Sequence, residues 1–175
     1  MSESPSLQQL HTLIAAADLA ALSDILIDCT EGGASVGFMN PLSRAKADAF
    51  WQDVAHHVAS GERALWVARD GDGLIVGTVQ VVFAQKENQP HRAEISKLLV
   101  HRRARRHGLG ARLMGAAEQG ARDAGKSVLV LDTATGGGAE SLYERLGWQF
   151  CGRIPDYALW PSGGLCATSI FYKPL

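Results

Sequence analysis

The sequence predicts a mixed α/β fold in which helices flank a central, mostly antiparallel sheet. Two segments before residue 60 carry apolar residues at helical spacing, and three runs rich in β-branched residues follow, separated by turn residues. A basic turn containing glycines then joins the last of these runs to another helical segment. With 175 residues and no repeat or low-complexity linker, the chain is expected to form one domain, residues 1–175.

Composition and charge exclude several classes of protein. The hydrophobic content is 46%, the charged content is 20% and the formal net charge is -1, so no global field favours nucleic acid or an anionic membrane as a partner. No apolar stretch approaches the ~20 residues that cross a bilayer, and the N-terminus does not resemble a secretory signal. Cys29, Cys151 and Cys166 show no metal-like spacing. We therefore expect a cytoplasmic protein with free thiols and no metal.

The N-terminal part is expected to contain two helices joined by a loop. Residues 7–29, rich in Leu, Ala and Ile, predict the first helix, and residues 31–41 must form a loop because three glycines permit unusual backbone angles there. Ser43 is the expected N-cap of a second helix that runs to about Ser60. Its apolar positions recur at helical spacing: Ala47, Phe50, Trp51, Val54 and Val58.

Three antiparallel strands are predicted next, over residues 64–69, 74–83 and 92–100. The Asp-Gly-Asp-Gly sequence of residues 70–73 is typical of a hairpin turn, and residues 84–91 form a polar turn. In the third strand we expect alternate residues to share a face. One face would carry Ala93, Ile95 and Lys97, and the other Glu94, Ser96 and Leu98.

The C-terminal part alternates helices and strands. A helix over residues 109–124 is closed by Gly125 in the left-handed conformation, and residues 127–131 are apolar enough for a strand buried on both faces. A short helix is predicted over residues 139–146. Two final strands are expected over residues 148–154 and 165–173, and the segment between them, 155–164, could close over a site.

The turn after residue 100 has the features of a phosphate-binding site. It leads directly into a helix, whose first N–H groups lack internal partners and carry partial positive charge. Gly108 and Gly110 leave room for a phosphate to approach these amides, and four arginines add charge, namely Arg102, Arg103, Arg105 and Arg106. The segment therefore predicts a pyrophosphate site.

Other phosphate ligands fit this turn less well. The third glycine position of a dinucleotide-binding motif is occupied by Leu113, and the Gly-Lys-Ser/Thr of a Walker A loop is missing from the chain. A nucleic-acid patch is disfavoured because the net charge is near zero and no row of aromatic residues accompanies the turn.

Two motifs together resemble the GCN5-related N-acetyltransferase (GNAT) superfamily. They are Arg105-x-x-Gly108-x-Gly110 after a strand, and Leu-Tyr-Glu-Arg-Leu-Gly-Trp at residues 142–148. The likeness runs from about residue 64 to the C-terminus. A closer likeness, to the tabtoxin-resistance acetyltransferases, includes residues 32–39, 92–94 and 131–133.

The resemblance implies acetyl-coenzyme A (acetyl-CoA) as co-substrate. The backbones of Leu98, Leu99 and Val100 would hold its pantetheine arm. Its pyrophosphate would be held by the amides of Arg105, Arg106, His107, Gly108, Leu109, Gly110 and Ala111. Many members have an Asn before the second helix of the core, where this chain has Thr-Gly-Gly-Gly at residues 135–138, so one side-chain contact is absent and glycine amides are candidates to replace it.

Acetyl transfer to an amine requires a base, an oxyanion donor and an acid for the leaving thiolate. The resemblance implies Glu94 and Asp132 together as base, and Tyr143 as acid. The N–H of Leu99 or Val100 is the candidate donor. Each side chain also has a structural alternative: Tyr143 as a core aromatic, and the two carboxylates as ion-pair or turn partners, or as groups that only attract a cationic amine.

Direct transfer is favoured over an acyl-enzyme because no His/Asp companion is readable near Cys151 or Cys166. The leading function is transfer of acetyl to the amine of a small molecule, with toxin or antibiotic inactivation suggested by the closer likeness. A protein N-terminal or lysine acetyltransferase and a non-catalytic acetyl-CoA-binding module are the alternatives. The sequence specifies neither the acceptor nor an oligomeric state.

Overall fold

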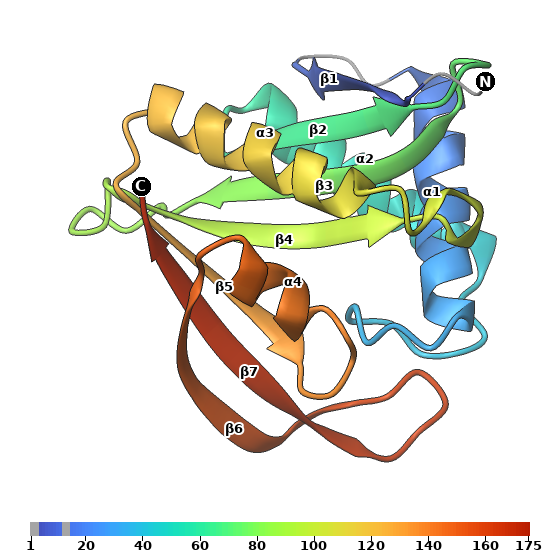
Figure 1. The fold of residues 1–175 in the computed structure, drawn as a ribbon. Helices are drawn as coiled ribbons and strands as arrows, with labels where there is room; N and C mark the ends of the chain where they lie inside the picture. Colours follow the sequence, from blue (N-terminus) through green and yellow to red (C-terminus); the bar gives the residue numbers. More distant parts are fainter. Residues whose placement is uncertain (1–3, 12–14) are drawn as a thin grey trace.

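The seven strands of the described residues form one mixed sheet (Figure 1). The computed structural model describes residues 4–11 and 15–175. The strand order is β1-β2-β3-β4-β5-β7-β6, and only β4 and β5 are parallel. The strands are β1 (Ser6–Leu10), β2 (Arg63–Arg69), β3 (Ile75–Phe83), β4 (Arg92–Val100), β5 (Val128–Ala134), β6 (Gln149–Leu159) and β7 (Leu165–Pro174). The predicted fold class is confirmed.

Helices cover both faces of this sheet. On one face lie α1 (Ala16–Glu31) and α2 (Arg44–Ala59), and on the other lie α3 (Leu109–Asp123) and the short α4 (Glu140–Arg145) (Figure 1). A 3-10 turn, η1 (Arg102–Ala104), precedes α3. Each face has its own apolar core, and the two cores are separated by the sheet. Within the described residues, no helix is long and apolar enough to span a membrane.

The predicted N-terminal helix is wrong at its beginning. Residues 6–10 form β1, which pairs antiparallel with β2 at the edge of the sheet, and α1 begins only at Ala16. The Leu and Gln residues there favour a helix locally, but the free edge of β2 offers backbone partners that override this preference. Residues 12–14, which the prediction included in this helix, lie outside the described part of the chain.

The predicted cap and turn residues of the next helices behave as expected. Ser43 accepts a hydrogen bond from the Lys46 N–H at the start of α2. Gly125 follows α3 with φ of 72°, and Gly147 follows α4 with φ of 80°. Both angles are left-handed, so a glycine is favoured at each position.

A β-bulge in β4 opens the sheet at its centre. The register with β3 shifts between Thr78 and Gln80, and Lys97 on the bulged side has φ of 52°. The predicted alternation is therefore wrong beyond Ser96, because the extra residue changes which face each side chain joins. Lys97 lies beside Phe50 of α2 instead of sharing the α3 face with Ala93 and Ile95.

The bulge accompanies a separation of β4 from β5. Their parallel pairing covers only Arg92–Glu94 against Val128–Val130, and the strands then diverge (Figure 1). The later residues of β5 pair with β7 on its other side.

Two predicted strands are longer than expected. β5 continues to Ala134, so Asp132 lies within the strand and is exposed, and burial is complete only at Leu129 and Leu131. Val128 and Val130, which alternate with these buried residues, are only half-buried, so the strand is not buried on both faces as predicted. β6 continues to Leu159 through irregularities between Ile154 and Ala158, so half of the predicted 155–164 cover is strand.

Close packing of α3 on β2 makes Gly120 a sensitive position. A Cβ at Gly120 would lie 2.1 Å from an atom of the Trp66 ring, whereas a Cβ at Gly115 on the same helix would meet nothing within 4 Å. We predict that Gly120→Ala lowers the free energy of unfolding by about 1–3 kcal/mol through overpacking. Gly115→Ala, the matched control, should raise it by about 0.5–1 kcal/mol through helix propensity. Urea unfolding of both variants checks this, and equal effects would contradict it.

Candidate active site

A cavity of about 950 Å³ occupies the gap between the diverging strands. Its walls come from the second half of β4, the second half of β5, the start of α3, α4, residues 33–37 and the β6–β7 hairpin. It contains every predicted site residue except His107: Glu94, Leu98, Leu99, Val100, Arg105, Arg106, Gly108, Leu109, Gly110, Ala111, Asp132 and Tyr143.

The start of α3 presents bare backbone to this cavity. Gly108 is the N-cap, with φ of 69°, and its carbonyl accepts the hydrogen bond of the Arg112 N–H. The amides of Leu109, Gly110 and Ala111 precede the first internal bond and so have no helical partner. A Cβ at Gly110 would meet only Leu142, at an ordinary 3.4 Å, so packing within the protein does not require a glycine. The space above Gly110 is available to a ligand.

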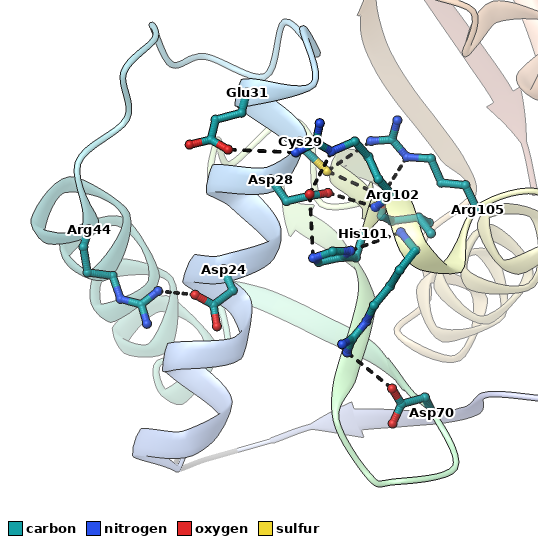
Figure 2. A network of polar contacts seen from close by, with 11 residues as sticks. Asp24, Asp28, Cys29, Glu31, Arg44, Asp70, His101, Arg102 and Arg105 are labelled. Atoms are coloured by element: carbon teal, nitrogen blue, oxygen red, sulfur yellow. Dashed lines mark hydrogen bonds and ion pairs between the residues drawn. The ribbon is translucent and has the colours of Figure 1, made fainter.

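The four arginines of the turn have different roles. Arg102 donates to Asp28 of α1 through both its backbone N–H and Nε, each at 2.8 Å (Figure 2). Arg103 pairs with Asp70 at 3.3 Å. These two therefore anchor the turn, and only Arg105 and Arg106 line the cavity. The sequence predicted four charges around one point, and the structure corrects this to two.

Arg105 also fixes the end of β4. Its Nε donates to the Val100 carbonyl at 2.9 Å, and its terminal nitrogen contacts Cys29 Sγ at 3.6 Å (Figure 2). Cys29 is buried, and burial raises the pKa of its thiol. The Arg105 backbone N–H already donates to Arg102 at 3.4 Å, so the amides available for a phosphate begin after it.

The glycine-rich segment before α4 is held by Glu140. One carboxylate oxygen accepts from the Gly136 N–H at 2.8 Å and the other from the Ser169 hydroxyl at 2.6 Å, and these bonds lower the pKa of Glu140. The Gly137 N–H donates to Ala134. Gly137 and Gly138 line the cavity, and of the three glycine amides only that of Gly138 is without a partner in the described residues.

Glu94 and Asp132 face the cavity from the two diverging strands. Burial raises the pKa of the Glu94 carboxyl above its ordinary value, and the negative charge of Asp132 raises it further. The Thr168 hydroxyl donates to Asp132 at 3.0 Å, which orients that carboxylate. The pair thus combines a carboxyl with increased proton affinity and an exposed, oriented carboxylate.

Tyr143 lies in the cavity wall and in the core. Its ring packs against Phe171 and Trp148, with centroids 5.8 and 6.2 Å away, and only 7% of the residue is exposed. Burial, together with the charge of Asp132, raises the pKa of Tyr143 to about 12. The phenol is therefore protonated at neutral pH and can only donate or share its proton.

Residues 31–41 and the β6–β7 hairpin meet at one end of the cavity. The Asn40 N–H donates to the Pro161 carbonyl at 2.9 Å, and the Ser35 hydroxyl donates to the Leu159 carbonyl at 3.3 Å. Tyr157 and Trp160 of the hairpin line the cavity. These contacts join two walls that are about 120 residues apart in the sequence.

Sequence reasoning missed three contributors to this site: Lys97, Cys29 and Thr168 all line the cavity. A lysine within a predicted strand was the one available signal for Lys97, because the bulge that positions it follows from strand pairing. His107 does not line the cavity, although its neighbours on both sides do.

The sequence profile of the acetyltransferase (GNAT) family matches residues 19–148, about three quarters of the chain. The protein belongs to the GNAT family. An uncharacterized N-acetyltransferase from the hisH–hisA intergenic region of Azospirillum brasilense is 37% identical over 117 residues, which cover 66% of this chain and 67% of the relative. This GNAT protein is therefore an enzyme, an N-acetyltransferase that uses acetyl-CoA as the acetyl donor.

Solved structures of GNAT proteins share the fold. A phosphinothricin acetyltransferase from Sinorhizobium meliloti, in complex with acetyl-CoA, has a TM-score of 0.81 and 19% identity, covering 99% of this chain and 89% of that one. A ribosomal-protein-alanine N-acetyltransferase from Brucella melitensis has a TM-score of 0.78 and 24% identity, covering 96% and 99%. At these identities the likeness concerns the fold.

The cavity of this GNAT enzyme fits acetyl-CoA. Free amides at the start of α3, the open space above Gly110, and the two cavity-facing arginines suit a diphosphate. The unpaired side of β4 beyond Glu94 offers backbone groups to an extended, amide-containing arm.

We predict that Gly110→Ala weakens acetyl-CoA binding at least about tenfold, because a methyl group would occupy the space that a phosphate oxygen needs. Gly115→Ala, five residues further along α3, is the control and should bind normally. Calorimetric titration of each variant with acetyl-CoA measures the effect. Equal affinity in the two variants would show that the diphosphate does not contact Gly110.

The raised pKa of Glu94 predicts a cost in stability. Between the ordinary and the raised value, the folded protein binds more protons than the unfolded chain, so stability falls as pH rises through this window. Glu94→Gln should therefore be more stable than the wild type at about pH 7, and the difference should vanish near pH 4. Urea unfolding at both pH values tests this. A gain of the same size at both would assign it to packing instead of charge.

Proposed function

We propose that the protein acetylates the amine of a small molecule by direct transfer from acetyl-CoA. The contact between residues 31–41 and the β6–β7 hairpin carries this proposal. We infer that these hydrogen bonds, by joining the two segments, leave less room for an extended peptide than for a small amine. A small amine could still reach Glu94 and Asp132, which lie in the same cavity as the start of α3.

Glu94 and Asp132 are proposed to prepare the amine. An alkyl amine is mostly protonated at neutral pH and must lose a proton before it attacks the thioester. The raised pKa of Glu94 suits a proton acceptor, and Asp132, oriented by Thr168, would attract the cationic form. This arrangement supports the two carboxylates acting together, with Glu94 as the acceptor of the proton.

Val100 is the better of the two proposed oxyanion donors. The His101 N–H donates to Val76 of β3 at 2.9 Å. Successive amides of a strand point in opposite directions. The Val100 N–H therefore faces away from β3, whereas the Leu99 N–H faces toward β3. This supports Val100, on the side of the gap, as the group that stabilises the developing negative charge.

Tyr143 is proposed to protonate the leaving thiolate. The phenol is held in its protonated form by burial and lines the cavity. Its rigid packing against Phe171 and Trp148 would keep the hydroxyl in one position. A proton donor in a fixed position lowers the barrier for departure of the thiol.

We propose that residues 1–175 act as one domain, which the continuous seven-stranded sheet supports. We also propose that the enzyme works in the cytoplasm, which the three free cysteines support.

Toxin or antibiotic inactivation is the proposed purpose. It is supported by the tabtoxin-resistance likeness of residues 32–39 and by the phosphinothricin acetyltransferase among the structural relatives.

Thiol release from acetyl-CoA on adding amines tests the function, with peptides bearing free N-termini as the comparison. Faster turnover with peptides than with any small amine would contradict a small-molecule acceptor.

We predict that Tyr143→Phe lowers turnover at least about tenfold and changes the acetyl-CoA affinity by less than about twofold. Tyr172→Phe, outside the cavity, is the matched control. Equal turnover in both variants would remove Tyr143 as the acid.

A further inference from the structure

Lys97 is a partly buried cation that the proposed reaction does not use. It lies at the bulge of β4 and lines the cavity, with Nζ 5.5 Å from the centre of the Phe50 ring. No carboxylate of the described residues lies within 4.0 Å of its Nζ, and no described acceptor takes a hydrogen bond from it. The ammonium group therefore makes a cation–π contact with Phe50, but among the described residues its three donors have neither a hydrogen-bond acceptor nor an ion-pair partner.

The two catalytic carboxylates do not serve as its partners. Burial and the nearby positive charge of Arg63 lower the pKa of Lys97, and the attraction of Asp132 and Glu94 does not compensate. The pKa of Glu94 stays raised although Lys97 is close by. Positive and negative charge are thus separated within one cavity, an arrangement that favours a ligand carrying both signs.

The backbone beside Lys97 adds further donors. The Lys97 Nζ lies 4.0 Å from the position of a Cβ on Gly37, in the loop that forms the cavity wall opposite β4. Ser35, Val36 and Gly37 all line the cavity, and their amides donate to no other described residue. Since Gly37 lies next to the Lys97 ammonium group, the free amides of this loop are candidate donors to an oxyanion that binds there.

We propose that the acceptor amine also carries an anionic group, such as a carboxylate, which binds between Lys97 Nζ and residues 35–37 while the amine lies against Glu94 and Asp132. This inference rests on the proposed function. It specifies the substrate class as amino acids or other amines that carry an oxyanion. Charge-assisted hydrogen bonds to the anion contribute binding that a neutral amine lacks.

Binding of matched acids and amides tests the proposal without requiring turnover. The enzyme is saturated with coenzyme A and titrated calorimetrically with glycine, β-alanine, γ-aminobutyrate, L-alanine and L-glutamine, and with the primary amide of each. At least one acid should bind about tenfold or more tightly than its amide. If no acid binds more tightly than its amide, the proposal is overturned.

Lys97→Met removes the charge at nearly constant size and should reduce that preference to about twofold or less. Lys86→Met, at an exposed lysine in the turn before β4, should keep it. Unchanged affinity for coenzyme A shows that the Lys97→Met protein is folded. If the Lys97→Met protein still prefers the acid over its amide, the proposal is also overturned. The acetyltransferase function is tested separately, by thiol release with neutral amines and by binding of acetyl-CoA.

Discussion

The early separation of β4 from β5 is the constraint on which the site depends. Parallel pairing stops at Glu94, and beyond this point the side of β4 that faces β5 has no strand partner, although the other side stays paired with β3. A continuous sheet would have filled the gap with its own hydrogen bonds. Here the gap becomes a cavity, and the bulge at Lys97 turns a charged side chain toward it. The same departure from regular pairing therefore supplies both the space and part of the chemistry.

Ion pairs outside the cavity hold the binding groups in place. Asp28 on α1 fixes Arg102, and Asp70 after β2 fixes Arg103, so the turn is attached to two separate elements (Figure 2). The hydrogen bonds from Arg102 lower the pKa of Asp28 although burial opposes them. Because α1 leads directly into residues 31–41, the end proposed to bind the donor and the end proposed to bind the acceptor share one support.

Local sequence patterns predicted most of the elements but not the contacts between them. The turn proposed to bind phosphate could be recognised in the sequence because Gly108, Gly110 and the arginines are adjacent in the chain. The separate roles of Arg102 and Arg105 could not, since they depend on α1. β1 was missed because its strand conformation comes from pairing with β2. Lys97 was placed on the wrong face because a bulge depends on the register of two strands.

The irregular course of β6 has a consequence beyond the cavity. β6 is an eleven-residue edge strand with exposed apolar side chains, including Phe150, Ile154 and Leu159. Such an edge is a template for intermolecular strand addition and aggregation. Pro155 lacks an amide donor, and Asp156 has φ of 52°, so the flat ladder that a further strand would need is interrupted. The irregularity that shapes this wall of the cavity is therefore also expected to disfavour self-association through this edge.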